Sequence, residues 1–164
     1  MAPEQLGRLV ERYAAALVLY ARQWCAAPED VVQEAFLKLV AQRRPPDNPV
    51  PWLYRVVRNA AVSAARTARR RQRHEAAAAR APAWFAIDPD TEGIDAEAAT
   101  AALVALPLEE REVIVAHLWG GLTFEQVGDL TGTSAPTAHR RYTAGLHNLR
   151  EILRVPCPAK KTPS

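Results

Sequence analysis

The stretch that decides the fold runs from Leu122 to Arg150 and reads LTFEQVGDLTGTSAPTAHRRYTAGLHNLR. Thr123, with Gln126 three residues later, forms a capping-box pattern that predicts the start of a helix. Gly132 can end that helix because it adopts the left-handed conformation without a steric penalty. Thr133 or Ser134 can cap a second helix, with Pro136 in its first turn. The stretch therefore predicts a helix, a tight turn and a second helix.

The second helix has one small and apolar face and one polar face. Its apolar positions recur at helical spacing and are Ala138, Tyr142, Gly145 and Leu149. Arginine, histidine, threonine and asparagine side chains project elsewhere. This arrangement is typical of the helix-turn-helix, whose second helix enters the DNA major groove. The alternative is a helical hairpin with a solvated polar face.

A second basic surface is predicted on a helix that begins near Pro51. From Asn48 to His74 there are seven arginines and no acid, whereas from Glu75 to Glu97 there are six acids and one arginine. Arginines in register along one helix can neutralise successive phosphates, and Asn59 and Ser63 can hydrogen-bond bases or backbone. The alternative is a solvated charged helix, which usually mixes both signs.

The rest of the chain also reads as helical. One helix is expected from Pro3 to Trp24, one from Pro28, and two more at Ala96–Leu106 and Pro107–Trp119, while Arg43–Pro51 holds four prolines and is expected to be a loop. No alternating strand pattern occurs. The fold class predicted is all-α, with two small helical domains at 1–75 and 96–154, a flexible acidic linker at 76–95 and a disordered tail at 155–164.

The sequence gives little support for a metal site, a disulfide bond or a membrane-spanning segment. Asp88 to Gly93, DPDTEG, begins like a calcium loop, but the position that needs a glutamate is Ala99. Cys25 and Cys157 match no metal spacing and are read as two free thiols, although a disulfide between them is possible. No cofactor is predicted. We see no signal peptide and no apolar run of about 20 residues, so we expect a cytoplasmic protein without membrane insertion.

Three motifs in this order resemble bacterial RNA polymerase sigma factors of the extracytoplasmic-function (ECF) kind. Glu29–Phe36, EDVVQEAF, looks like the polymerase-binding helix of region 2, and Trp52–Asn59, WLYRVVRN, is similar to the promoter-melting helix that follows. The segment that opens LPLEEREVIVAHLWGGLTFEQVGDLTG at Leu106 resembles region 4. The resemblance implies a three-helix region 2 domain, a region 4 helix-turn-helix domain, and binding to core RNA polymerase and promoter DNA.

The resemblance also implies three sets of site residues. Polymerase binding, at the clamp coiled coil, would involve Asp30, Gln33 and Glu34, and the flap of the polymerase is a further expected contact. The single-stranded minus-ten element would be held by Trp52, Tyr54, Arg55, Arg58, Asn59, Ser63, Arg66, Arg69 and Arg70. The minus-thirty-five element would be read by Thr137, His139, Arg140, Arg141 and Thr143. Trp52 is either a stacking platform or a core residue, and Arg141 serves either phosphate binding or an internal ion pair.

Three departures from the family pattern bear on specificity. The loop RRPPDNPVP before Trp52 lacks the aromatic segment that many relatives carry, and Ala144 and Leu146 stand where relatives often have arginine. The linker is acidic, in a segment that in the family crosses near the polymerase active site. An anti-sigma factor is a possible further partner that the sequence does not decide.

Two other classes of function compete with a sigma factor. The first is a stand-alone helix-turn-helix regulator that never binds polymerase, which leaves the EDVVQEAF helix without a role. The second is a nuclease that uses Asp88, Asp90 and Glu92, but no histidine or lysine lies nearby in the sequence to assist these acids. We therefore expect a transcription initiation factor and no enzyme.

Overall fold

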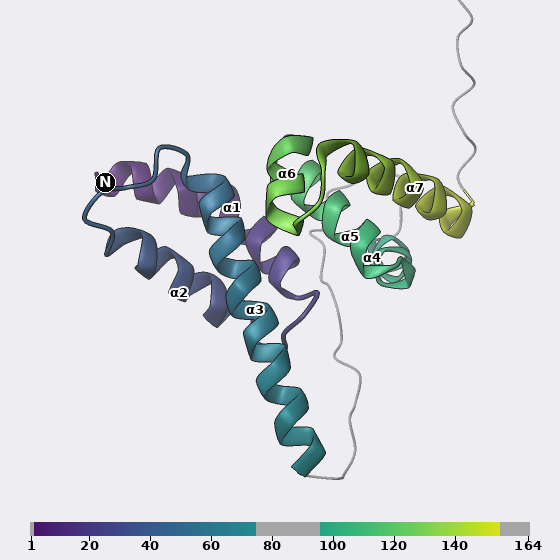
Figure 1. The fold of residues 1–164 in the computed structure, drawn as a ribbon, viewed down its shortest axis with the longest axis horizontal. Coiled ribbons are helices and arrows are strands. Elements are labelled where there is room, and N and C mark those ends of the chain that lie inside the picture. Colours follow the sequence, from purple (N-terminus) through teal and green to yellow (C-terminus); the bar gives the residue numbers. More distant parts are fainter. Residues whose placement is uncertain (1, 75–95, 155–164) are drawn as a thin grey trace, which may run out of the picture.

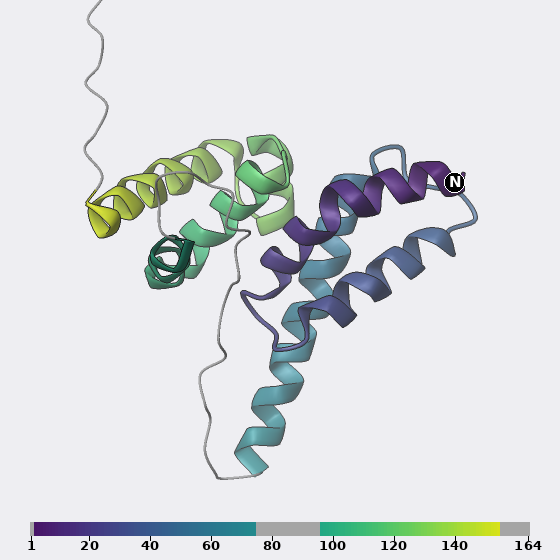
Figure 2. The ribbon, with the colours of Figure 1, turned by 180° about the vertical axis from the view of Figure 1, so that it is seen from behind.

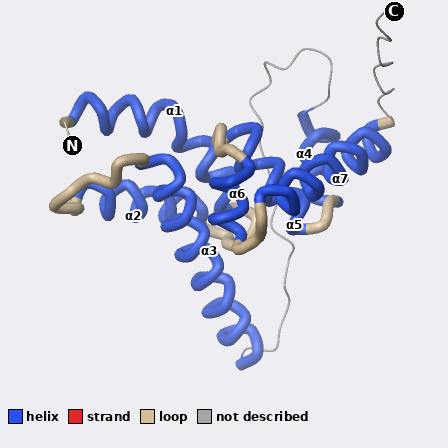
Figure 3. Tube along the Cα trace, turned by 45° about the horizontal axis from the view of Figure 1, so that its top comes forward, coloured by secondary structure: helices blue, strands red, loops and turns tan. Residues whose placement is uncertain are grey.

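The computed structural model describes residues 2–74 and 96–154, and within these ranges every regular element is a helix (Figure 3). The elements are α1 (Pro3–Ala21), α2 (Pro28–Val40), α3 (Pro49–His74), α4 (Ala96–Ala105), α5 (Leu108–Ile114), the π-helical turn η1 (Val115–Trp119), α6 (Phe124–Thr131) and α7 (Ala135–Leu153). The all-helical prediction is confirmed. The predicted linker, the tail, Cys157 and the calcium-like stretch lie outside the described residues.

The first three helices form a bundle. Proline in the first turn starts both α1 and α2, where its missing N–H costs least, and Glu29 and Asp30 follow in the first turn of α2, where the helix dipole favours them. The three helices bury a shared apolar face, with Leu17, Leu39 and Leu53 almost completely covered. Helix α3 is longer than the bundle, and Figures 1 and 2 show its second half projecting away from the other helices. None of residues 62–71 is buried, so this half of α3 is accessible from several sides.

The predicted helix-turn-helix is present as α6 and α7. Thr123 Oγ1 accepts a hydrogen bond from the Gln126 backbone N–H at 3.3 Å, and the Gln126 side chain accepts one from Thr123 N–H at 2.9 Å. Gly132 ends α6 with φ of 71°, and Ser134 rather than Thr133 caps α7. The capping box, the glycine stop and the cap of the second helix are confirmed.

The helix predicted from Pro107 to Trp119 changes its winding before it ends. Residues 108–114 are α-helical, and the last turn, η1, is a wider π-helical turn that closes with the Gly120 N–H donating to Val115 O at 3.2 Å. Such turns redirect the side chains that follow. A Cβ atom on Gly120 would lie 2.7 Å from the Tyr54 hydroxyl, so glycine permits the close approach of this turn to α3.

The two helical groups pack against each other. A single core cluster contains Leu17 and Tyr20 of α1, Tyr54 of α3, and Ala116 and Val127 from the second group. Helix α1 contacts η1, and α3 contacts α6. A smaller cluster joins Leu103, Leu106 and Ile114, with partly buried Tyr142 and Leu149 of α7 against it. The sequence predicted two helical units but gave no sign that they share a core.

No helix among the described residues is both long enough and apolar enough to cross a membrane.

Candidate nucleic-acid interface

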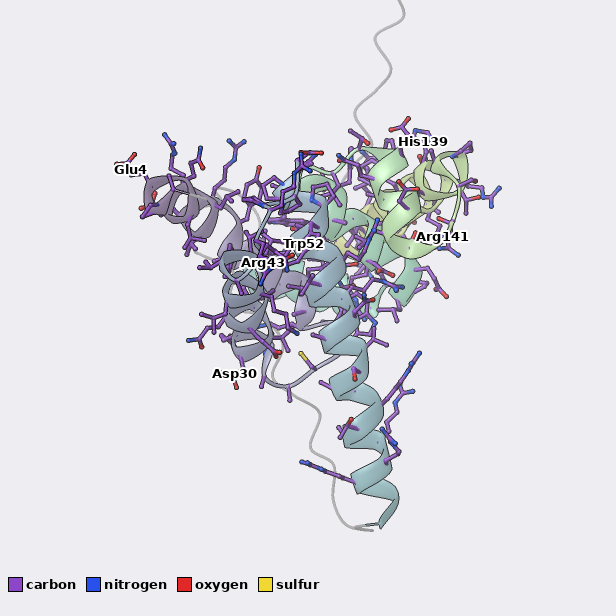
Figure 4. The ribbon with its side chains drawn as sticks, turned by 60° about the vertical axis from the view of Figure 1, so that its left-hand side comes forward. Glu4, Asp30, Arg43, Trp52, His139 and Arg141 are labelled. Carbon is purple, nitrogen blue, oxygen red and sulfur yellow. The ribbon has the colours of Figure 1, made fainter. Side chains whose placement is uncertain are left out.

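The polar face of α7 presents most of the predicted base-reading residues. His139, Arg140 and Thr143 are exposed, whereas Thr137 and Arg141 are half-buried. The buried side of the same helix carries Ala138 and Gly145, and a Cβ on Gly145 would lie 2.7 Å from Ile114 Cδ1 of α5. Because α5 fixes α7 at this close approach, the opposite face is held outward. Figure 4 labels His139 and Arg141 on α7.

His139 is oriented by its neighbours. Its ring lies edge-on to Phe124 at 5.0 Å between centroids, and the Thr143 hydroxyl donates to the His139 backbone oxygen at 3.0 Å. The Thr143 hydroxyl is therefore tied to its own helix, and its methyl group is the part most available for contact. No acidic partner of Arg141 is found within the described residues, so its predicted internal ion pair is not seen there.

The basic face of α3 is continuous and exposed. No acidic residue occurs in α3, and Asn59, Ser63 and Arg66 follow one another at helical spacing. The exposed members of the predicted set are Arg55, Asn59, Ser63, Arg66, Arg69 and Arg70. Since the second half of the helix stands clear of the other helices, these side chains can follow a backbone of phosphates without displacing protein.

Three other predicted minus-ten residues are not freely exposed. Trp52, labelled in Figure 4, is half-buried and packs against the core cluster, which leaves both of its predicted roles possible. Tyr54 is completely buried, with its ring 4.9 Å from that of Tyr20. This position does not support the predicted contact of Tyr54 with bases, because the second helical group covers the ring. Arg58 is half-buried and ion-paired.

The partner of Arg58 is Glu112 of α5, a carboxylate to which the sequence pattern assigns no role. Arg58 Nε donates to Glu112 Oε1 at 2.6 Å, and the Tyr20 hydroxyl donates to the same oxygen at 2.7 Å. Burial, with the Glu112 charge beside it, raises the pKa of Tyr20 well above its ordinary value, so the phenol remains a donor. A contact between residues 92 positions apart leaves no local signal in the sequence.

The predicted polymerase-binding residues lie on the exposed side of α2. Asp30, Gln33 and Glu34 are all exposed, and Glu34 is paired with Lys38 at 2.8 Å. Beside them, α1 and α2 form an apolar groove of about 360 Å³ whose walls include Val10, Phe36, Leu37 and Val40. Helix α2 therefore offers charged groups next to an apolar surface, a combination suited to docking a helix.

A hollow lies between α1 and the proline-rich loop, and none of the predicted site residues lines it. It measures about 490 Å³ and is lined by Arg8, Arg12, Tyr13, Pro45 and Asp47, among others. Arg8 and Arg12 lie one helical turn apart, a spacing that could have signalled a small basic patch on α1. The hollow places further positive charge beside the loop that precedes α3.

Comparison with known proteins assigns both halves of the chain. Residues 4–71 match the family model of sigma-70 region 2, and residues 102–151 match that of sigma-70 region 4. Over 136 residues the chain is 35% identical to the RNA polymerase sigma factor CarQ of Myxococcus xanthus. The matched segment makes up 78% of this chain and 75% of CarQ. The chain belongs to the RNA polymerase sigma factor family. Sigma factors are DNA-recognition subunits of RNA polymerase.

Other relatives extend the comparison. The chain is 32% identical over 159 residues to the probable RNA polymerase sigma factor RfaY of Xanthomonas campestris pv. campestris. The matched segment makes up 90% of this chain but only 40% of RfaY. This sigma factor thus spans well under half the length of that relative. The fold is similar to that of the sigma factor RpoE, solved in complex with the anti-sigma factor NepR from Bartonella quintana, with a TM-score of 0.72. The sequence identity is 23%, and the match covers 95% of this chain and all of the RpoE chain. It is also similar to CnrH solved with the cytosolic domain of CnrY, with a TM-score of 0.59 and 22% identity over 95% and 92% of the two chains.

Proposed function

We propose that this sigma factor directs core RNA polymerase to promoters with three separate surfaces. Asp30, Gln33 and Glu34 on α2 bind the clamp coiled coil, the α3 face holds the opened minus-ten strand, and the outward face of α7 reads the minus-thirty-five element. The observation that carries the proposal is the presence of two exposed basic helical faces, on α3 and α7, inside the segments that match regions 2 and 4.

Promoter opening needs no covalent chemistry in this proposal. The exposed arginines of α3 bind a single strand through its phosphates, and Asn59 and Ser63 offer hydrogen bonds to extruded bases. If these groups bind the opened strand more tightly than the duplex, the difference in binding free energy drives melting. Tyr54 is buried in the packed arrangement and can contact bases only if the second helical group moves away, whereas Trp52 is partly exposed.

The proposed partners follow from the same surfaces. They are core polymerase, through its clamp coiled coil and flap, and promoter DNA. Both structural neighbours were solved with a second protein, one of them described as an anti-sigma factor, and a partner of that class is part of the proposal for this chain. Because polymerase and DNA are in the cytoplasm, we place its action there.

The proposal is tested by reconstitution with purified core polymerase. We expect a complex at submicromolar concentration and run-off transcription from a cognate promoter, selected from a random DNA pool with the holoenzyme. The stand-alone regulator predicts instead that the protein retains a DNA site from the same pool while no complex with core polymerase forms at micromolar concentration. Failure to start transcription from any selected site would overturn the sigma-factor mechanism proposed here.

Arg140→Ala is expected to relax sequence preference in the upstream promoter element. Arg140 is exposed in the first half of α7, the part of a recognition helix that contacts base edges. Loss of one good base contact should reduce discrimination at one position by about 1–3 kcal/mol. Competition binding with single-base variants of the upstream element measures this discrimination.

The control is Arg150→Ala, which changes an exposed arginine in the last turn of the same helix and should leave the sequence preference unchanged. Equal weakening of Arg140→Ala on every sequence would reassign Arg140 to phosphate binding.

A further inference from the structure

A buried carboxylate joins the two sigma regions. Glu112 of α5 is 5% exposed, and one of its oxygens accepts hydrogen bonds from Tyr20 of α1 and Arg58 of α3. Both donors belong to the region 2 segment, and the acceptor belongs to the region 4 segment. A charge at this depth is costly unless it is paired, so Glu112 favours arrangements in which both donors are in place.

The same contact occupies a residue of the proposed DNA surface. The Arg58 side chain is 30% exposed, its Nε–H is taken by Glu112, and its guanidinium lies 5.9 Å above the Trp24 ring. Its neighbours Arg55 and Asn59 are exposed. Arg58 is therefore held back from a phosphate while the two regions remain packed, whereas the rest of the α3 face is available.

The interface around Glu112 is apolar but not fully satisfied. Tyr20, Tyr54 and Val127 are completely buried in it, and Gly120 approaches the Tyr54 ring closely. The Tyr54 hydroxyl is buried and has no hydrogen-bond partner among the described residues. An unpaired buried hydroxyl lowers the stability of the packed arrangement, which brings it closer in free energy to a separated one.

We propose that the packed arrangement is a closed state of this sigma factor, latched by Glu112, and that Arg58 joins the DNA surface only when the latch opens. The phosphate backbone then replaces the Glu112 carboxylate as the partner of Arg58. Nucleic acid that binds the open state more tightly shifts the equilibrium toward it, and breaking the latch should strengthen binding of nucleic acid by reciprocity. The DNA role of Arg58 rests on the proposed function, whereas the closed state itself does not.

The distance between the two regions in the full chain tests the closed state. Fluorescent dyes on cysteines placed at the exposed positions Gln42 and Glu151, with Cys25 and Cys157 changed to serine, report it by energy transfer. We expect Glu112→Gln to raise the ratio of open to closed molecules about tenfold or more, since Arg58 loses its charged partner. Tyr20→Phe, which removes one hydrogen bond from the region 2 side, should raise the ratio to a smaller extent.

Glu110→Gln is the matched control. Glu110 lies in the same helix and accepts a hydrogen bond from Asn148 at 2.8 Å, a contact within region 4, so its substitution should leave energy transfer unchanged. Helicity measured by circular dichroism identifies a variant that simply unfolds, and Tyr20→Phe then decides. Unchanged energy transfer in Glu112→Gln and Tyr20→Phe with full helicity would overturn the latch.

Single-stranded DNA tests the link to Arg58. Added to the wild-type chain, an oligonucleotide with the minus-ten sequence of a selected promoter should lower energy transfer, and Glu112→Gln should bind it more tightly. If the oligonucleotide binds neither protein, the proposed function of α3 fails while the energy-transfer result still reports on the latch. If it binds both equally although the latch variant is open, the role of Glu112 in withholding Arg58 is contradicted.

Discussion

Gly128→Val is expected to unfold the helix-turn-helix and abolish promoter-specific transcription. Gly128 is buried in α6 against the turn that leads into α7. A Cβ atom there would lie 2.8 Å from Thr133 O and 3.1 Å from Ala135 N, both backbone atoms of the turn. Backbone cannot swing aside as the end of a side chain can, so the two helices would have to separate. We expect a loss of about 3 kcal/mol of folding free energy, measured by chemical denaturation with circular dichroism.

Gly7→Ala separates this steric effect from the general consequences of replacing a helical glycine. Gly7 lies in α1, and a Cβ atom there would meet nothing within 4 Å. Alanine should therefore stabilise the protein by about 0.5–1 kcal/mol, because glycine is a poor helix former. If Gly128→Val unfolds at the same denaturant concentration as the wild type, the close packing of α6 against the turn is not as described.

Replacing Arg66, Arg69 and Arg70 together by alanine is expected to weaken binding to single-stranded DNA about a hundredfold at 0.15 M salt. On a single strand each phosphate contact adds about 0.7 to the slope of log affinity against log salt, so losing three contacts should lower that slope by about 2. All three side chains are exposed on the half of α3 that stands clear of the bundle, so their loss should leave folding intact. Fluorescence anisotropy over a salt series measures both quantities.

The corresponding triple lysine variant keeps the three charges and is the control. Its salt slope should stay close to that of the wild type, since counterion release depends on charge rather than on guanidinium geometry. A wild-type slope in the alanine variant would show that these arginines are solvated charges that contact no phosphate. A reduced slope in the lysine variant would indicate that geometry, and not charge alone, binds the strand.

Local features of the molecule could be predicted because their causes are local. The cap at Thr123 and the stop at Gly132 each depend on residues within one helical turn, and both were found as expected. The exposed basic face of α3 follows from helical spacing alone, as does the outward face of α7. The order of the region 2 and region 4 motifs was enough to indicate the family, which the comparisons show.

The residues that could not be placed from sequence are those whose surroundings come from the other half of the chain. Tyr54 and Arg58 sit in a motif that indicates DNA contact, yet one is buried and the other is paired with Glu112, 54 positions away. Glu112 itself is one of three acids in α5, and its sequence neighbours do not set it apart. Neither spacing nor composition distinguishes a solvated glutamate from one that accepts two hydrogen bonds across an interface.

The sequence by itself thus determined the helices, their caps, the two basic faces and the sigma-factor family, because backbone propensity and side-chain periodicity act over a few residues. Only the tertiary structure decided that the two regions share a core and that Arg58 is held by Glu112. Burial and pairing of a charge depend on which distant surface packs against it, and that surface is chosen by the free energy of the whole fold.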